Sequence, residues 1–318
     1  MKISFKQIFC ILLLLVCLLP LAVFVTAGPS APGANERLAA KPRLTAGGRL
    51  NFDVLSDTAD YFAGHFGLRQ ELITANAAAD AAVFRESATP EVLLGTGGWL
   101  YYADTLADYT GAAPMTARQL WCAAQNLALM QEYAQTQGAA FLFVCAPNKN
   151  TVYPAQMPAR YTRAEGPSDL DRLETLLNAQ DVAFCDVRQT LLDAQGQTYY
   201  RTDSHWNGYG SYLAGRQILQ ALGKEADTED VSLSMQQHAG DLYGMLYPAS
   251  DRKEDAPAPA QLRTFSYLGD VRGADDQLIR TQSGAEGTLF MFRDSFGSSL
   301  SPLLVEGYAK VTVVDIRY

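Results

Sequence analysis

The sequence predicts an α/β domain, a mainly parallel sheet flanked by helices, preceded by one N-terminal transmembrane helix. Three observations predict it. A long apolar run opens the chain, and strand-like apolar segments then alternate with amphipathic helical segments through the body. The composition is that of a globular protein, with 48% hydrophobic and 19% charged residues. The 318 residues carry 25 Lys and Arg against 34 Asp and Glu, and this net charge of -9 argues against a nucleic-acid partner.

The apolar run at residues 8–27 is long enough to cross a bilayer as a helix. Lys2 and Lys6 precede it, so the positive-inside rule keeps residues 1–7 in the cytoplasm and sends the rest across the membrane. We therefore expect a single-pass protein of the cell membrane with an extracytoplasmic body. A removable signal peptide is the alternative, because the small residues that end at Ala27 also suit a cleavage site.

Residues 28–50 are rich in Pro, Gly and Ala and predict a linker, so the folded domain is expected over 51–318. Apolar residues at helical spacing predict a helix from Phe52 to Phe66 that ends at Gly67, and a second helix follows over 68–86. Strand-like segments at 92–95 and 99–103 flank two glycines and predict a hairpin.

Alternating helices and strands follow. Thr116 and Gln119 form a capping box for a helix that runs to Gly138, and Ser168 caps the next helix. A further helix runs from Asn207 to Leu222 and is stopped by a glycine. Strands are expected at 139–146, 181–187, 288–294 and 310–316, and the first two are expected to be buried. The polar stretch 224–287, with 251–260 inside it, is predicted to be irregular.

The five cysteines show no CxxC pair and no spacing typical of structural zinc, so no metal is expected. Cys145 and Cys185 fall in predicted strands, where a free thiol behaves as a small hydrophobe. A disulfide among these two and Cys122 is the less favoured alternative.

Two segments carry residues suited to nucleophilic chemistry. In the first, Asp203 precedes His205 by two residues at a helix start, where the carboxylate can accept the Nδ1 proton and leave Nε2 as a general base. In the second, Ser295 follows an apolar strand and opens a helix, where its hydroxyl is exposed beside backbone N–H groups. Helix capping is the simpler interpretation of either segment alone, and a metal site at Asp203 and His205 lacks a convincing third ligand.

These segments carry a resemblance that spacing alone does not supply. The sequence Asp203-Ser204-His205-Trp206 resembles the DxHW signature of the DHHW group and of the AlgX and AlgJ proteins, which are circularly permuted relatives of SGNH hydrolases. Further matching segments run in the same order over about 51–318; they are His65 to Arg69, Leu94 to Tyr101, Ala146 to Lys149 with Tyr153-Pro154 and Pro158, Gly240-Asp241-Leu242, and Asp294-Ser295-Phe296.

The resemblance implies a polysaccharide O-acetyltransferase without a cofactor, in which Ser295 is the nucleophile and His205 and Asp203 complete the triad. It implies a polysaccharide acceptor and a membrane-bound O-acyltransferase that supplies the acetyl group. Four weaker candidates for oxyanion or substrate binding are Asn148, Lys149, Tyr153 and Arg293. Asn148 could equally cap the next turn, Lys149 and Arg293 could pair with acidic neighbours, and Trp206 is expected to pack against the catalytic loop.

Two alternatives to this function stay open: a polysaccharide acetyl esterase with the same triad, and a non-catalytic polysaccharide-binding or assembly protein. The family pattern also continues beyond the strand at 310–316. We therefore expect either that this chain lacks its last C-terminal elements or that this final strand leaves a sheet edge unpaired.

Overall fold

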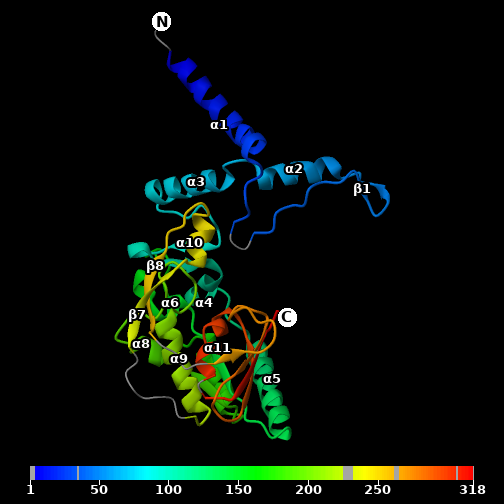
Figure 1. The fold of residues 1–318 in the computed structure, drawn as a ribbon. Helices are drawn as coiled ribbons and strands as arrows, with labels where there is room; N and C mark the ends of the chain where they lie inside the picture. Colours follow the sequence, from blue (N-terminus) through cyan, green and yellow to red (C-terminus); the bar gives the residue numbers. More distant parts are fainter. Residues whose placement is uncertain (1–3, 34–35, 225–231, 261–264, 306, 318) are drawn as a thin grey trace. The chain divides into compact units, whose positions relative to one another are not determined.

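The computed structural model describes residues 4–33, 36–224, 232–260, 265–305 and 307–317 (Figure 1). The chain divides into two compact units: the first comprises Met1–Leu94 with Asp241–Arg252, and the second comprises Gly95–Gly240 with Lys253–Tyr318.

The first unit opens with α1 (Phe5–Ala27), whose N-terminus carries a capping box between Ser4 and Gln7. This helix of 23 residues has a mean hydropathy of 3.3 over its most apolar window, which is enough by length and composition to cross a membrane or to serve as a signal sequence. The other elements of this unit are β1 (Thr45–Ala46), β2 (Arg49–Leu50), α2 (Val54–His65), α3 (Arg69–Val83), β3 (Val92–Leu94) and α10 (Asp241–Leu246). The two helices and the strand predicted before residue 95 are thus present, and β1 and β2 form a small hairpin at the end of the predicted linker.

The second unit holds the remaining elements. Its helices are α4 (Leu106–Thr110), α5 (Ala117–Thr136), α6 (Lys149–Val152), α7 (Asp169–Asn178), α8 (Arg188–Leu192), α9 (Gly208–Ala221) and α11 (Ser301–Leu304), with 3-10 turns η1 (Thr96–Gly98), η2 (Ala103–Thr105), η3 (Pro154–Gln156) and η4 (Ser295–Ser298). Its strands are β4 (Leu100–Tyr102), β5 (Phe143–Cys145), β6 (Phe184–Asp186), β7 (Leu233–His238), β8 (Glu254–Pro259), β9 (Ser266–Tyr267), β10 (Leu278–Gln282), β11 (Thr288–Arg293) and β12 (Lys310–Asp315).

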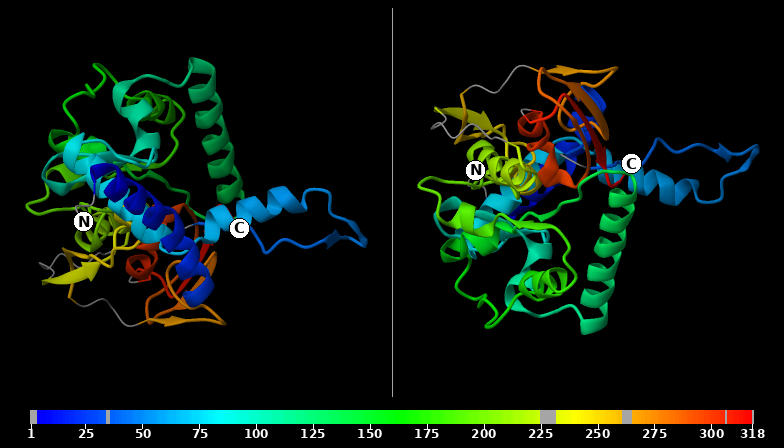
Figure 2. Two further views of the ribbon diagram at one scale, coloured as in Figure 1. Left: turned by 90° about the horizontal axis from the view of Figure 1, so that it is seen from above. Right: turned by 90° about the horizontal axis from the view of Figure 1, so that it is seen from below.

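Capping places the main helices of this unit where the sequence predicts them. Thr116 and Ser168 each make both hydrogen bonds of a capping box, at the starts of α5 and α7. The long helix α5 packs on α7 (Figure 2). Their shared core contains Ala124, Leu177 and Val182, against which the parallel strands β5 and β6 place Phe143 and Phe184.

The prediction of a mainly parallel sheet is wrong for the described residues, whose sheets are small and mostly antiparallel. The pairs β5–β6 and β11–β12 are parallel, whereas β1–β2, β7–β8, β9–β10 and β10–β12 are antiparallel. The four-stranded sheet has the order β11-β12-β10-β9, and β10 runs antiparallel to both of its neighbours. The reason lies in β10, where buried Ile279 and Thr281 alternate with more exposed residues, the pattern of a strand with one buried face.

The stretch predicted to be irregular contains four strands and a helix. Residues 251–260, predicted as a loop, include β8, which pairs antiparallel with β7. Ala256 and Ala258 are buried and alternate with Pro257 and Pro259, so the strand has period-two burial despite its prolines. A proline lacks the N–H of a ladder donor, but a two-stranded ribbon tolerates it where that N–H would point away from the partner strand.

The final strand is not itself an unpaired edge among the described residues. β12 lies between β11 and β10 and is hydrogen-bonded on both sides, with Val311 and Val313 buried. The second partner of β12 is β10, which lies in the stretch predicted to be irregular. Among the described strands, β11 is therefore an edge of this sheet, and it leads into Ser295.

The cysteines in the described residues are all unpaired thiols, as the favoured interpretation predicts. Burial raises the pKa of the Cys145 thiol to about 11, helped by the charge of Asp294, and burial likewise raises the pKa of Cys185. A raised pKa lowers the thiolate fraction, which suits packing rather than reactivity.

Candidate active site

A short turn in the second unit presents Asp203 and His205. Its ends are held by an antiparallel bridge between Tyr199 and Trp206 and by a hydrogen bond from Asn207 N–H to Thr198 O (2.9 Å). Asn207 then caps α9 by accepting the Gly210 N–H at 2.9 Å. The turn is therefore tied to the start of a buried helix, which fixes the position of the two side chains.

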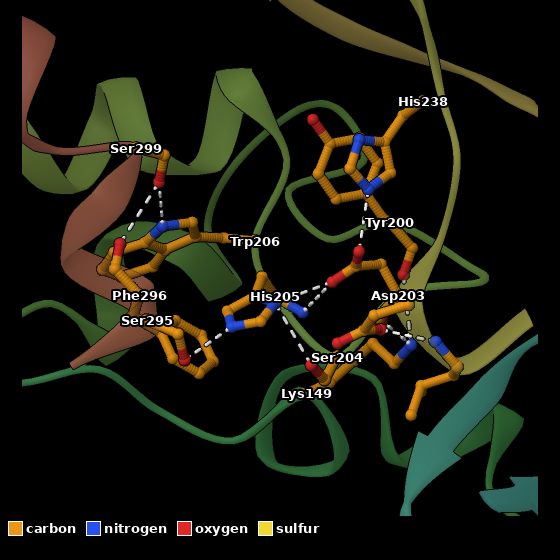
Figure 3. Close-up of polar contacts among 12 residues, drawn as sticks. Lys149, Tyr200, Asp203, Ser204, His205, Trp206, His238, Ser295, Phe296 and Ser299 are labelled. Atoms are coloured by element: carbon orange, nitrogen blue, oxygen red, sulfur yellow. Dashed lines mark hydrogen bonds and ion pairs between the residues drawn. The ribbon is translucent and has the colours of Figure 1, made fainter. Parts of the chain in front are cut away.

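Lys149 lies inside this turn. It is 4% exposed, and its Nζ donates to the carbonyl oxygens of Tyr200 (3.2 Å), Arg201 (3.2 Å) and Asp203 (2.5 Å) (Figure 3). The ammonium also lies 5.1 Å from the centre of the Tyr101 ring. These contacts with three carbonyls assign Lys149 to the shape of the turn rather than to a substrate.

Ser295 reaches the turn from 90 residues away in the chain. It follows β11 and opens η4, where Asp294 is the N-cap and accepts the Phe296 N–H at 2.9 Å. The Phe296 ring packs against the rings of His205 (4.8 Å between centroids), Trp206 (5.2 Å) and Tyr199 (6.4 Å). This aromatic cluster docks the Ser295 turn onto the Asp203 turn.

Trp206 completes the docking. It is 1% exposed, and its indole N–H donates to Ser299 Oγ at 2.7 Å, one turn beyond Ser295. The predicted packing role of Trp206 therefore agrees with its position. Gly297 is required here because a Cβ would lie 2.5 Å from the Cβ of Arg293.

The three residues of the predicted triad form a continuous chain of hydrogen bonds (Figure 3). Asp203 Oδ1 lies 2.7 Å from His205 Nδ1 and also accepts the His205 backbone N–H at 2.9 Å. His205 Nε2 lies 2.8 Å from Ser295 Oγ. The side chain of Asp203 is 7% exposed, that of His205 is 26% exposed, and Ser295 is exposed to solvent.

The electrostatics fit an activated serine. Burial alone would raise the pKa of Asp203, but hydrogen bonds from His205 and His238 and the charge of His205 outweigh it and hold this pKa well below its usual range. The carboxylate is therefore ionised and accepts the Nδ1 proton, so His205 Nε2 is free to accept the serine proton. An exposed hydroxyl with such a partner is the arrangement used for acyl transfer through a serine.

Comparisons with known proteins bear on this geometry. Residues 92–289 match the family described as an SGNH hydrolase-like domain, acetyltransferase AlgX. The chain belongs to this family. The matched range includes Asp203 and His205 and ends shortly before Ser295.

Two curated relatives are probable alginate O-acetylases AlgJ. The one from Pseudomonas putida is 24% identical over 216 residues, which is 65% of this chain and 52% of the relative. The one from Pseudomonas syringae pv. tomato is 27% identical over 158 residues, 48% of this chain and 38% of the relative. The chain thus spans about half or less of the length of these relatives. Among solved structures, Bacillus cereus PatB1 with a sulfonyl adduct aligns with a TM-score of 0.51 at 14% identity, over 73% of this chain and 87% of that chain; this likeness concerns the fold.

The remaining site candidates of this AlgX-family domain lie in protein contacts. Arg293 is 4% exposed, and its guanidinium binds Asp315 (3.3 Å), Ser298 Oγ (2.8 Å) and backbone oxygens. Tyr153 accepts the Thr198 N–H at 2.8 Å and packs on Trp99. These positions do not support the expected contacts with a substrate, because the Lys149 ammonium, the Tyr153 hydroxyl and both Nη atoms of Arg293 have protein partners. The buried Nε of Arg293 has no hydrogen-bond partner among the described residues.

Asn148 is the half-buried N-cap residue of α6, and its side-chain amide donates to Asp108 at 3.1 Å. The Asn148 amide has a second hydrogen, and the predicted contact with an oxyanion would use it. The Phe296 N–H, by contrast, is donated to Asp294, so an oxyanion hole at this turn would need that bond to open.

Two residues beside the triad are not among those predicted from the sequence. His238 Nε2 lies 2.8 Å from Asp203 Oδ2, and Glu254 accepts the N–H groups of Arg201 (2.9 Å) and Thr202 (2.8 Å). Both come from β7 and β8, in the stretch predicted to be irregular. For Glu254, a signal was available: small and larger residues alternate in 254–259, and this alternation predicts a strand if its prolines are accepted within a strand.

Replacing Lys149 by methionine tests its assignment to the turn. We expect the free energy of unfolding to fall by about 2–4 kcal/mol, because three carbonyl oxygens lose a charged donor inside the protein. Urea unfolding of the full chain in detergent measures this. Lys310→Met, at an exposed position on β12, is the matched control and should change stability by less than about 0.5 kcal/mol. Equal stability of the two variants would contradict the assignment.

Proposed function

We propose that this chain is an extracytoplasmic O-acetyltransferase that acetylates hydroxyl groups of a cell-surface or secreted polysaccharide through an acetyl-serine intermediate. The observation that carries the proposal is the hydrogen-bonded chain Asp203–His205–Ser295, with links of 2.7 and 2.8 Å that end on an exposed hydroxyl. Membership of the AlgX family supports acetyl transfer as the reaction. The names of the AlgJ relatives support a polysaccharide as acceptor.

The first half-reaction loads the enzyme. Ser295 Oγ attacks the carbonyl carbon of the acetyl donor while His205 Nε2 takes the hydroxyl proton. The tetrahedral intermediate collapses, and the leaving oxygen of the donor takes that proton from His205. Asp203 stays ionised throughout and stabilises the imidazolium that forms.

The second half-reaction unloads it. A sugar hydroxyl gives its proton to His205 and attacks the acetyl-serine, and Ser295 Oγ leaves with the proton returned by His205. Binding groups for the developing oxyanion would include the Asn148 amide. Acetyl-coenzyme A is not available outside the cytoplasm, so a membrane-bound O-acyltransferase would deliver the acetyl group. Helix α1 would hold the domain at that membrane.

A polysaccharide acetyl esterase is the second candidate, and the exposure of Ser295 favours it, because an open serine admits water as readily as a sugar. The two functions differ only in what attacks the acetyl-serine.

The test uses the full chain in detergent with a chromogenic acetyl ester. Intact mass spectrometry should detect one added acetyl group, and deacetylated oligosaccharides should remove it faster than water and emerge acetylated. Hydrolysis that no oligosaccharide accelerates would identify an esterase. Polysaccharide binding without any adduct would contradict both enzymatic functions and leave a binding protein.

A further inference from the structure

The Asp203 carboxylate is shared by two imidazoles (Figure 3). Oδ1 lies 2.7 Å from His205 Nδ1, and Oδ2 lies 2.8 Å from His238 Nε2. An ionised carboxylate only accepts hydrogen bonds, so both of these nitrogens carry a proton. The oxygen that does not face His205 is therefore held by a second histidine.

His238 comes from the antiparallel strand pair β7–β8, which also binds the backbone of the same turn. It is the last residue of β7, and its register partner is Glu254, the first residue of β8. Glu254 accepts the N–H groups of Arg201 and Thr202 and the hydroxyl of Thr202. One cross-strand pair thus contacts the turn twice, at its backbone through the glutamate and at its carboxylate through the histidine.

The His238 ring is itself fixed. It stacks on the Tyr200 ring with 3.7 Å between centroids and 14° between planes. Its side chain is 33% exposed, whereas that of Asp203, which it contacts, is 7% exposed. Gly240, two residues later, approaches Thr202 so closely that a Cβ would overlap the Thr202 carbonyl oxygen.

We propose that His238 is a positioning residue for acyl transfer, which holds Asp203 Oδ2 so that Oδ1 stays on His205 Nδ1. The inference rests on the proposed function and adds a fourth side chain to its triad. The terminal torsion of an aspartate is soft, and the two hydrogen bonds from the His205 ring and backbone both act on the single oxygen Oδ1. A donor at Oδ2 fixes that torsion and thereby the direction of the His205 ring, on which proton transfer from Ser295 depends.

Four variants of the full chain separate this role from a structural one. His238→Phe keeps a ring that can stack on Tyr200 but has no donor. His238→Gln places an amide nitrogen near the position of Nε2. His238→Asn carries the same amide on a side chain that is too short to reach Asp203 Oδ2. Gln236→Ala, at an exposed position two residues earlier on β7, is the control. Two rates are measured: acetyl-ester turnover and the sulfonylation of Ser295 by a sulfonyl fluoride, followed by intact mass.

We expect His238→Phe and His238→Asn to lower kcat and the sulfonylation rate by about 10- to 100-fold, the usual effect of losing one hydrogen bond to a charged group. KM should stay within about twofold, since His238 acts through Asp203 and not on the substrate. His238→Gln should recover to within about threefold of the parent chain, and Gln236→Ala should match it. Melting temperatures of all four identify any variant that fails to fold, and the comparison of Gln with Asn then carries the test.

Two results would overturn the inference: parent rates in all three His238 variants, or equal losses in all three without rescue by glutamine. Ser295→Ala is run beside them. If it is sulfonylated as fast as the parent chain, the proposed function itself fails. If it is inert while His238→Phe reacts at the parent rate, only the role of His238 fails.

Discussion

Ser295→Ala should lower acetyl-ester turnover at least about 10³-fold and abolish the acetyl adduct in the intact mass spectrum. The reason is that Ser295 Oγ is the hydroxyl bound to His205 Nε2, and no covalent intermediate forms without it. The residual rate should equal that of water attack on a bound ester. The measurement is single-turnover kinetics with mass spectrometry on the full chain.

The control for this variant is Ser266→Ala, an exposed serine on β9 in the same unit. It should retain the parent rate and the adduct. An acetyl adduct on Ser295→Ala, or equal turnover of the two variants, would show that another group is the nucleophile.

Asp203→Asn should lower kcat by about 10³- to 10⁴-fold, with little change in KM. The carboxylate faces two imidazole N–H groups, but an amide has one oxygen to accept and an NH₂ group that cannot. One histidine must therefore change its tautomer or turn away. If His205 moves its proton to Nε2, it can no longer accept the proton of Ser295. Steady-state kinetics of the parent chain and Asp203→Asn at one pH measures the loss of kcat. A loss of less than tenfold would contradict the assigned role.

The same substitution predicts a change in the pH dependence of stability. The pKa of Asp203 is lowered in the folded protein, so its ionised form stabilises the fold above the ordinary aspartate pKa of about 3.9, and this contribution is lost as the pH falls. The parent chain should therefore lose stability below about pH 5, whereas Asp203→Asn lacks this contribution throughout. The difference in melting temperature between the parent chain and Asp203→Asn should therefore change little from pH 7 to pH 5 and narrow as the pH falls below about 4. A difference that stays constant down to about pH 2 would be inconsistent with the lowered pKa.

Local signals predicted much of this fold correctly. The capping boxes at Thr116 and Ser168 and the cap at Asn207 place α5, α7 and α9 within a residue or two of the expected starts. These signals work because a cap is made by residues three or four positions apart, so tertiary contacts are not needed to satisfy it. Strand pairing failed where partners are distant in sequence. β10 next to β12 depends on which backbone groups remain unpaired after the chain collapses.

The site shows the same division. The sequence alone determined the identity of the triad candidates, because Asp203 and His205 form a two-residue pattern before a helix and Ser295 follows an apolar strand. Only the tertiary structure decided that Ser295 Oγ meets His205 Nε2, through the packing of Phe296 and Trp206 between two turns 90 residues apart. It likewise decided the places of Lys149 and His238. The sequence does not show whether a charged or titratable side chain faces a substrate, three carbonyls or a carboxylate. Its surroundings depend on which atoms of distant segments pack around it.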